Sequence, residues 1–492
     1  MKKLFLIHLL LFAFVHFVSA QATVVASREF DADDFLKGSL NMNEAGIMMY
    51  GWEEKGTFAC KALDKNLDNY ASWTISTEKR ATLADITYSQ KTGQAIALIQ
   101  TGKSTYLFVA MDVKTKKKKT TELLVPKGTG LREILYAVGD QIWFVGYNKK
   151  SFFLYTCDIA SPKLVPLDPG ISGEKFNILN LDIMDNDEVA VVYSFGPKKL
   201  RELDVLVLDA EGKTLVPRLM ESASIEERNL AINASVTRLG KGDYALTGNY
   251  NKKGKSDANG VYFARYSDGK IGYLSNFDYS DFDHFYDHLS AKEREKREAK
   301  IEKKKSKGKD VTLTALSIMH KTISTKTGLV FIAEYYYPTY YTVTTTSYSG
   351  GKATTTTRTE FDGYQYTHAL IVGIDKNGKK VYDLNFPIRP QYKPFVPVRF
   401  LRTYSDSDIV HMVYTSGRRI YSARVEDNKL ENKYFDMLNK LGQNEKDKGS
   451  ASSSIYWYDN YFFILEIEKT KEKGLGGKRT TKRFAFKVEV QE

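Results

Sequence analysis

Short apolar runs recur along the chain at nearly constant intervals. Each run has the length and the content of Val, Ile, Phe and Tyr that are typical of a buried β-strand. The starts of successive runs are separated by 47, 47, 48, 55, 85, 80 and 53 residues. The runs are GIMMYGW from Gly46, GQAIALIQ from Gly93, DQIWFVGY from Asp140, EVAVVYSF from Glu188, DYALTGNY from Asp243, GLVFIAEYYY from Gly328, DIVHMVYT from Asp408 and YFFILEIE from Tyr461. A fixed period in this range predicts a solenoid or a propeller.

Each run also has the same neighbours. Another strand and a short turn precede it, as in ILYAVGDQIWF and SIYWYDNYFFIL. A looser loop and a hairpin follow it, as in DVLVLDAEGKTLVPRL at 204–219 and HALIVGIDKNGKKVYDLNFPI at 368–388. Four antiparallel strands per period describe one propeller blade. We therefore predict an all-β protein that folds as a single eight-bladed β-propeller. Seven blades, or a pair of β-sandwiches, are the alternatives.

The two ends of the repeat region predict how the ring closes. After YFFILEIE, only the strand KRFAFKVEV fits before Glu492, so the last blade lacks one strand. The segment TVVAS, at 23–27, precedes the first unit and has strand character. We expect this N-terminal strand to close the last blade. Cys60 and Cys157 fall in units one and three, too far apart for the Cα separation of about 7 Å that a disulfide allows, so we expect both to be free.

The repeat spacing resembles that of the broad superfamily of exported bacterial β-propellers. The sequence contains no WD dipeptide repeat, no paired-glycine Kelch signature and no series of Asp boxes of the sialidase type. YSDGKIG at 266–272 is a single, weak match to an Asp box. The resemblance implies the fold, and no activity follows from it.

The first twenty residues have the pattern of a secretory signal peptide. MKK is a positive start, residues 4–18 are apolar, and Val18-Ser19-Ala20 is a small-residue cleavage signal. The rest of the sequence contains no apolar stretch of the length that a membrane helix needs. We expect a signal peptide at 1–20, a β-propeller domain at 21–492, and a periplasmic or extracellular location without a transmembrane segment.

The net charge of +12 is concentrated in two short segments. The signal peptide holds two lysines, and residues 291–310 hold ten basic and five acidic residues, so the remainder carries +5. Export and this modest remainder argue against nucleic acid as a partner. We expect a monomer whose partner is a protein or a cell-envelope polymer.

Two insertions account for the two long steps of the repeat, at 278–311 and 334–366. The first follows the fourth strand of one blade, and the second follows the second strand of the next. Because strands alternate in direction, both insertions should project from the same face of the disc.

The first insertion predicts a charged helix from about 291 to 306. Ser290 and Glu293 form a capping-box pattern, and Gly308 is a suitable stop. Phe282, Phe285 and Tyr286 should anchor its start. Two interpretations are open: a solvated charged arm, or a basic contact for an acidic polymer, an anionic lipid surface or an acidic protein. The second interpretation depends on three basic residues, Lys303, Lys304 and Lys305.

A His- and Asp-rich group precedes this helix. Asp283, His284, Asp287 and His288 place two imidazoles four residues apart with carboxylates beside them. This spacing suits a divalent metal, although a third ligand from elsewhere would be needed. The alternative is a polar cluster at the start of the helix. We expect no other cofactor.

The second insertion predicts a long hairpin around a Ser-Gly-Gly-Lys turn at 349–352. Its Thr and Tyr residues suit a half-exposed pleated surface. The tyrosines either stack on sugars or contact a protein, or they pack across the hairpin and onto the blade. They are Tyr335, Tyr336, Tyr337, Tyr340, Tyr341 and Tyr348.

Motifs for catalysis are scarce. The sequence has no G-x-S-x-G, H-E-x-x-H or phosphate-binding glycine motif. His320, His368 and His411 fall in predicted strands, where a structural imidazole is the common outcome. We therefore predict a non-catalytic binding or scaffold propeller that uses the face with both insertions. The alternative is a propeller hydrolase or lyase that acts on a glycan or peptide with carboxylates at the central funnel.

Overall fold

The computed structural model describes most of the chain after residue 21. The described residues are 22–30, 38–149, 152–167, 177–184, 186–195, 202–217, 219, 230–252, 257–268, 270–308, 313–417, 419–436, 451–471 and 479–490. The predicted signal peptide lies outside them. Most of the described residues are in β-strands, and one α-helix, α2 (Ala291–Lys305), lies among them.

The described strands form eight antiparallel sheets that follow one another along the chain. In the first four sheets, strands adjacent in sequence are adjacent in the sheet. Their strands are β2 (Gly38–Asn41), β3 (Ile47–Glu54), β4 (Thr57–Leu63) and β5 (Asn69–Ser76); β6 (Thr82–Ser89), β7 (Gln94–Gln100), β8 (Thr105–Asp112) and β9 (Lys118–Leu124); β10 (Gly130–Val138), β11 (Gln141–Tyr147), β12 (Phe152–Asp158) and β13 (Val165–Leu167); and β14 (Asn177–Ile183), β15 (Val189–Phe195), β16 (Glu202–Leu208) and β17 (Thr214–Val216).

The fifth and sixth sheets have an interrupted first strand, and the seventh is regular. Their strands are β18 (Leu230–Ala231), β19 (Ser235–Gly240), β20 (Asp243–Asn251), β21 (Gly260–Ser267) and β22 (Lys270–Asp278); β23 (Leu316–Met319), β24 (Ile323–Ser324), β25 (Gly328–Ser349), β26 (Lys352–Asp375) and β27 (Lys380–Pro387); and β28 (Arg402–Asp406), β29 (Ile409–Ser416), β30 (Arg419–Glu426) and β31 (Lys429–Asp436).

The eighth sheet joins the two ends of the described chain. It contains β32 (Ala451–Tyr458), β33 (Tyr461–Lys471) and β34 (Arg479–Val490), with β1 (Ala22–Phe30) as its fourth strand. β1 pairs antiparallel with β34, from Ala22 opposite Val490 to Phe30 opposite Arg483.

Hydrophobic side chains fill the spaces between neighbouring sheets. Eight buried clusters each draw residues from two successive sheets, and one of them joins the last sheet to the first. That cluster packs Ile47 and Met49 against Trp457 and Phe463. Repeated four-stranded sheets packed face to face in this way are the architecture of a β-propeller.

This packing explains the apolar runs in the sequence. A second strand lies inside its sheet and between two neighbouring sheets, so both of its faces are buried. In β7, five consecutive residues are buried, whereas the outer strand β9 is mostly exposed. Continuous apolar runs therefore mark second strands, and polar stretches mark outer strands.

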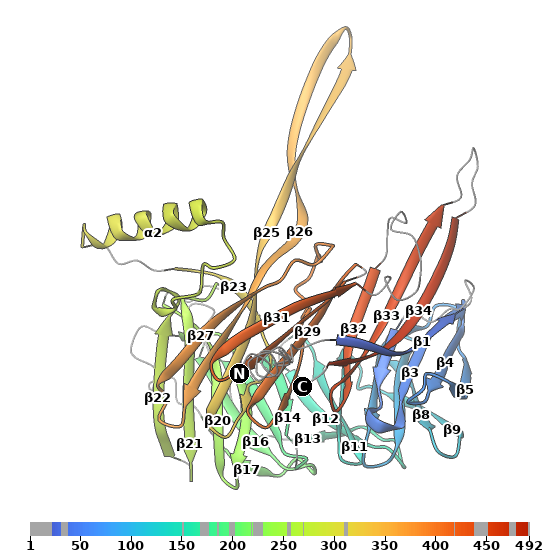
Figure 1. The fold of residues 1–492 in the computed structure, drawn as a ribbon. Coiled ribbons are helices and arrows are strands. Elements are labelled where there is room, and N and C mark those ends of the chain that lie inside the picture. The colour runs from blue at the N-terminus through green and yellow to red at the C-terminus, as the bar shows by residue number, and fades with distance from the viewer. Residues whose placement is uncertain are drawn as a thin grey trace, which may run out of the picture.

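The two insertions project from the same side of the sheets, which is the upper side in Figure 1. We call this side the upper face. β25 and β26 continue beyond their sheet as a long two-stranded hairpin, and α2 lies beside the base of this hairpin (Figure 1). Gly350 and Gly351 form the turn with φ of 57° and 75°, the left-handed conformation that a tight hairpin turn requires. The predicted hairpin and helix are both confirmed.

Two further predictions concern the cysteines and membrane-spanning segments. Cys60 and Cys157 are free and buried, as expected from their separation in the repeat. Among the described residues, no helix is both long and apolar enough to cross a membrane.

Candidate functional site

A cleft of about 910 Å³ lies at the base of the hairpin on the upper face. We call it the hairpin cleft. Its walls come from the segment before α2, the first turns of α2, the start of β23, both hairpin strands and Arg389, which follows β27. The residues that carry its chemistry are Phe285, His288, Arg297, Tyr335, His368 and Arg389. The two insertions thus meet in one cavity of a size typical of ligand sites.

The inner wall of the cleft is a stack of three rings. His368 lies between His288, with ring centroids 4.1 Å apart, and Tyr335, at 5.0 Å. Phe285 packs edge-on against His368 at 5.3 Å. Phe282 and Phe285 are buried and hold the segment before α2 on the sheet, as the sequence predicts.

We assign the tautomer of both imidazoles from the hydrogen bonds of this stack. Thr367 donates its hydroxyl to the carbonyl of Tyr335 (3.2 Å) and therefore accepts from Nδ1 of His368 (2.9 Å). Nδ1 of His288 donates to the carbonyl of Phe285 (3.1 Å). Each Nε2 is thus left as an acceptor. Within the part of the chain that the structure describes, the buried Nε2 of His368 has no hydrogen-bond partner.

Both imidazoles of the cleft are neutral at neutral pH. Burial lowers the pKa of His288 to about 4 and lowers the pKa of His368 well below its usual range. A neutral imidazole with a protonated Nδ1 presents a lone pair on Nε2. The wall of the cleft therefore offers hydrogen-bond acceptors rather than positive charge.

Positive charge is found at the rim of the cleft instead. Arg297, on the first turns of α2, places its guanidinium 5.4 Å from the centre of the Tyr286 ring. Arg389, from the connection after β27, also lines the cleft and is exposed. The carboxylate of Glu293 caps α2, because it accepts hydrogen bonds from the backbone N–H and the hydroxyl of Ser290.

The hairpin base also carries exposed aromatic rings. Tyr340 contacts Phe361, and Phe361 contacts Phe395, each with ring centroids 5.8 Å apart. Tyr340 is 60% exposed, Phe395 70% and Val396 67%. We call these four residues the aromatic ridge. Large apolar side chains exposed together on a monomer commonly mark an interaction site.

Buried polar groups hold the loop that carries Phe395. The carboxylate of Glu334 accepts from the backbone N–H groups of Phe400 and Leu401 at 3.0 Å and from Nε2 of His320 at 2.7 Å. The hydroxyl of Tyr366 donates to the carbonyl of Val398 at 2.6 Å. The loop between the sixth and seventh sheets is therefore fixed against the hairpin base.

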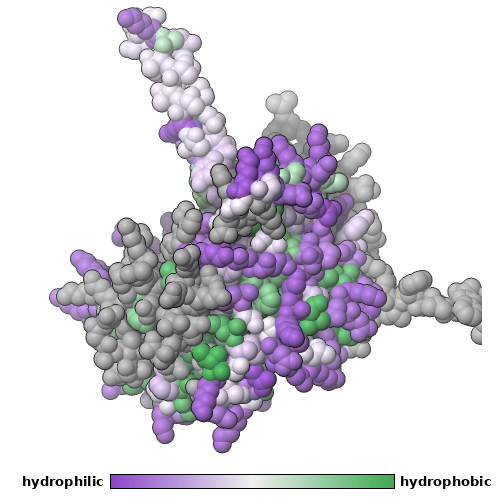
Figure 2. Space-filling model, turned by 90° about the vertical axis from the view of Figure 1, so that its left-hand side faces the viewer, coloured by the Kyte–Doolittle hydropathy of each residue, from purple (hydrophilic) through white to green (hydrophobic). Residues whose placement is uncertain are grey.

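The predicted tyrosines divide into two groups. Tyr335 is buried and Tyr336 is half-buried, so these two rings pack in the hairpin base. Tyr337, Tyr340, Tyr341 and Tyr348 are exposed. Figure 2 shows the projecting hairpin in pale colours along most of its length, neither strongly hydrophilic nor strongly hydrophobic.

The predicted basic residues lie at the far end of α2. Lys303 and Lys304 are exposed, and the side chain of Lys305 lies outside the described residues. The capping box at Ser290 and Glu293 is present. α2 stands away from the sheets (Figure 1), so its charges face solvent on the upper face.

The predicted metal ligands have different partners. Asp287 accepts from Nδ1 of His284 and from Arg294, both at 2.6 Å, whereas His288 stacks on His368. Across the described ranges, no group of three or more His, Cys, Asp or Glu residues is arranged to hold a metal ion. The metal site stays a prediction.

Some carboxylates of the innermost strands link neighbouring sheets. Asp85 accepts from the backbone N–H of Leu135 at 2.7 Å, and Asp182 accepts from that of Val236 at 2.8 Å. Burial raises the pKa of Asp182. These two carboxylates therefore connect neighbouring sheets by hydrogen bonds.

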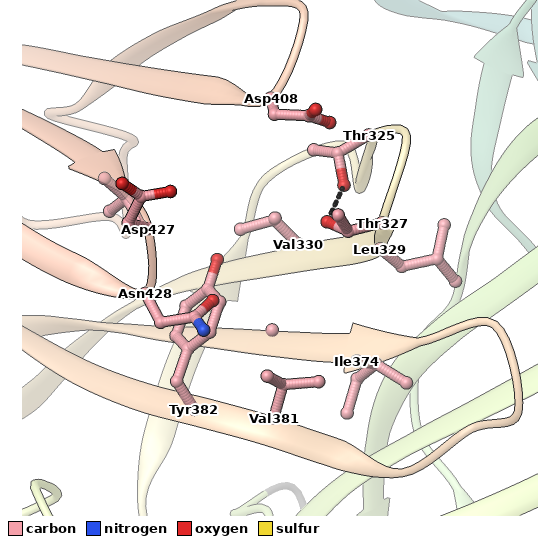
Figure 3. Close-up of a pocket in the computed structure, with 12 residues that line it drawn as sticks. Thr325, Thr327, Leu329, Val330, Ile374, Val381, Tyr382, Asp408, Asp427 and Asn428 are labelled. Carbon is pink, nitrogen blue, oxygen red and sulfur yellow. Dashed lines mark hydrogen bonds between the residues drawn. The ribbon is translucent and has the colours of Figure 1, made fainter.

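A smaller cavity of about 280 Å³ lies between the sixth and seventh sheets, among turns of the opposite side (Figure 3). Thr325 and Thr327 bond each other at 3.2 Å, and Asp408 accepts from the backbone N–H of Lys326 at 2.6 Å. Asp427 and Asn428 lie across the cavity (Figure 3). The polar groups named here mostly form hydrogen bonds within the turns around the cavity. The hairpin cleft is therefore the better candidate site.

Sequence reasoning missed three features of the upper face. It treated His368 as a structural strand residue, and it did not single out Arg389 or the exposed pair Phe395 and Val396. The segment RPQYKPFVPVRF, at 389–400, held the available signal. An aromatic and proline-rich connection after a fourth strand should emerge on the same face as both insertions.

Comparisons with known proteins assign no family to the chain. No protein-family model matches it, and no curated protein matches it. Among solved structures, it is similar to the dihydro-heme d1 dehydrogenase NirN (11% identity, TM-score 0.45, 94% of this chain and 78% of that chain), to the WD40 domain of SCAP from fission yeast (9%, 0.42, 96% and 98%) and to the polysaccharide lyase Uly1 (10%, 0.41, 93% and 100%). These values give no basis for transferring an activity.

Proposed function

We propose that this protein is an exported, non-catalytic binding propeller that engages an acidic cell-envelope polymer through its upper face. The observation that carries the proposal is the aromatic ridge, whose rings Tyr340 and Phe395 are both more than half exposed. Exposed rings held in fixed positions give contact area at low cost in conformational entropy.

The charge of the same face favours an acidic partner. α2 presents Lys303 and Lys304 to solvent, and Arg297 and Arg389 lie at the rim of the hairpin cleft. A polymer that lies across the ridge and the cleft would reach both the rings and the basic side chains. Basic surface of this kind raises the association rate and the affinity for polyanions, and salt weakens both effects.

The scaffold of the proposal is a closed ring of eight blades. The eight sheets, and the hydrophobic cluster between the last and the first, support this number. Asn41 donates to the carbonyls of Tyr456 and Trp457 at 2.9 and 2.8 Å, which adds polar links between the same two sheets. We infer that β1 fastens the ring, because it supplies the outer strand of the last sheet.

Export is the second part of the proposal, and it rests on the signal-peptide pattern of residues 1–20. Fractionation of cells that express the full sequence would test it. We expect the protein in the periplasm or medium, with Gln21 as its first residue. A cytoplasmic product that retains Met1 would contradict export.

Binding of purified protein to soluble acidic polysaccharides would test the main proposal. We expect retention on polyuronate and much weaker retention on a neutral glucan. Combined Tyr340→Ala and Phe395→Ala substitution should weaken binding at least tenfold, which corresponds to about 1.4 kcal/mol. Tyr434→Ala is the matched control, because Tyr434 is a 68% exposed tyrosine on the outer strand β31.

Three results would contradict this function. Equal binding to acidic and neutral polymers would remove the role of charge. Undiminished binding by the ridge variant would remove the role of the rings. Capture of a protein from envelope extract, lost in the ridge variant while polysaccharides fail to bind, would replace the polymer with a protein partner.

A further inference from the structure

We infer that the hairpin cleft is a subsite for a single sugar unit that carries a carboxylate, such as a hexuronate residue of the polymer. The inference rests on the proposed function and deepens it by naming the unit that is recognised. It starts from one atom, Nε2 of His368, which is buried and has no partner among the described residues.

The chemistry of that atom selects a hydrogen-bond donor. Nδ1 of His368 is bonded to Thr367, so Nε2 is the acceptor of a neutral ring. A buried acceptor without a partner destabilises the fold, and such atoms are commonly paired with water or with a ligand. His288 presents a second Nε2 acceptor from the ring stacked on His368. Two adjacent acceptors suit the vicinal hydroxyl groups of a sugar.

The rim of the cleft offers two guanidinium groups to an anion. Arg297 is held over the Tyr286 ring, and Arg389 also lines the cleft. A guanidinium pairs with a carboxylate through two parallel hydrogen bonds. An inorganic hydrogen phosphate dianion would match the arginines but carries only one proton for the two imidazole acceptors. A neutral sugar would match the imidazoles and leave the arginines unused.

The remaining walls suit the body of a sugar ring. Tyr336, Tyr337, Pro338 and Tyr366 contribute apolar surface with polar edges. The volume of about 910 Å³ exceeds what one sugar unit fills, which leaves room for the neighbouring units of a polymer. The cleft opens on the same face as the aromatic ridge, so one chain could occupy both.

The test uses short oligosaccharides and purified protein that begins at Gln21, the proposed mature start, in isothermal titration calorimetry. The probes are tetragalacturonate and tetraglucuronate, with cellotetraose as the neutral control. We expect at least one acidic tetramer to bind and cellotetraose to bind at least tenfold more weakly. His368→Phe keeps a ring in the stack but removes Nε2, and it should weaken acidic tetramer binding at least tenfold.

His411→Phe is the matched control. His411 is also buried, also lacks a described partner on its ring nitrogens and also stacks on a tyrosine, Tyr404, at 4.5 Å, but it lies in the seventh sheet and does not line the cleft. We expect His411→Phe to keep wild-type affinity. As a second measurement, the ¹⁵N resonance of His368 Nε2 should shift upfield when the acidic tetramer donates a hydrogen bond to it.

The outcomes separate the subsite from the general function. Binding of polyuronate without binding of either acidic tetramer would overturn the subsite and leave the polymer function standing. Binding of the tetramers with equal affinity by wild type and His368→Phe would place the sugar elsewhere and overturn the inference. Equal binding of cellotetraose would overturn the carboxylate requirement, and failure of all polymers and tetramers would overturn both proposals.

Discussion

The imidazole of His288 stacks on that of His368 with ring centroids 4.1 Å apart and planes inclined by 10°. His288 belongs to the first insertion, and His368 lies in β26 at the base of the hairpin that the second insertion forms. The contact therefore fastens the start of α2 to the hairpin. It depends on both rings being uncharged, because two stacked imidazolium ions would repel each other.

This contact predicts a loss of stability in mild acid. Burial lowers the pKa of His288 from 6.5 to about 4 and lowers that of His368 well below 6.5. Below pH 6.5 these two histidines bind protons in the unfolded chain but stay neutral in the folded chain. The free energy of unfolding is therefore highest above pH 6.5 and falls as the pH drops towards 4. Urea unfolding at pH 7.5, 6.0 and 5.0 would measure this decline.

The His368→Phe variant provides the control for acid sensitivity. It cannot take up this proton in either state, so its urea midpoint should fall less between pH 7.5 and 5.0 than that of the wild type. His411 contributes in the same direction, since burial lowers its pKa to about 4. A double variant, His368→Phe with His411→Phe, should be flatter still. Parallel pH profiles for all three proteins would show that other groups cause the decline.

Charge reversal on α2 tests the proposed attraction between the upper face and an acidic polymer. We expect Lys303→Glu with Lys304→Glu to weaken binding of polyuronate several-fold at low salt, with the difference disappearing at about 0.5 M salt, because exposed charges are screened. The matched control reverses Lys376 and Lys379, two exposed lysines in the turn between β26 and β27. Equal losses in both variants would indicate an effect of net charge rather than of α2.

Much of the fold follows from the sequence because burial leaves a regular signal. The run VAVVYSF became β15, with six consecutive buried residues, since a second strand has neighbours on both faces. Ser290 and Glu293 predicted the start of α2, because a capping box depends only on residues close in sequence. Hairpin turns and caps depend on residues close in sequence, so a single sequence shows them.

The candidate site was less predictable because it depends on long-range contacts. Nothing near His368 in sequence shows that His288 will stack on it, or that Thr367 will fix its tautomer. The exposed position of Phe395 likewise depends on Glu334 in β25, whose carboxylate accepts from the backbone of the same loop at Phe400 and Leu401. The pattern predicted that both insertions share one face, and only the packed structure brought these residues together.

The link from Glu334 to the loop gives a third prediction. Glu334 is fully buried and accepts from three donors, those of His320, Phe400 and Leu401. A glutamine there would turn an NH₂ group towards an N–H, so Glu334→Gln should lower the free energy of unfolding by about 1–3 kcal/mol. Polymer binding should also weaken, because the loop carries Phe395. Urea unfolding and polymer retention would measure both effects.

Glu360→Gln is the control for this substitution. Glu360 accepts from the hydroxyl of the exposed Tyr341 and pairs with Arg358 on the projecting hairpin. An exposed pair contributes about 0–1 kcal/mol, so the control should unfold close to the wild-type midpoint. A Glu334→Gln protein with wild-type stability would show that the carboxylate does not hold the loop.

The two cysteines should be unreactive in the folded protein. Cys60 and Cys157 are buried, and burial raises the pKa of the Cys157 thiol to about 12 and that of the Cys60 thiol further. The thiolate is the reactive form, so a disulfide reagent such as Ellman's should release little product from native protein. After denaturation it should titrate two thiols per chain, the number in the sequence. Rapid reaction without denaturant would contradict the burial of the corresponding strands.

The last prediction concerns β1, which pairs with β34 at the other end of the described chain. Phe30 ends β1, is buried, and packs in the cluster that contains Met49 of the first sheet and Trp457 of the last. Phe30→Ala should therefore lower the free energy of unfolding by about 3–5 kcal/mol. Val25→Ala, in the same strand but 45% exposed, should change it by no more than about 0.5 kcal/mol.

Deletion of residues 22–30 should exceed the effect of Phe30→Ala, because it also removes every backbone hydrogen bond between β1 and β34. The exposed edge of β34 would then invite association between chains. We expect a lower urea midpoint and concentration-dependent aggregation. Removing the hairpin tip, residues 344–357, is the matched control, since this segment projects beyond the sheets (Figure 1) and should leave the midpoint unchanged. If both deletions left the midpoint unchanged, β1 would not be the element that fastens the ring.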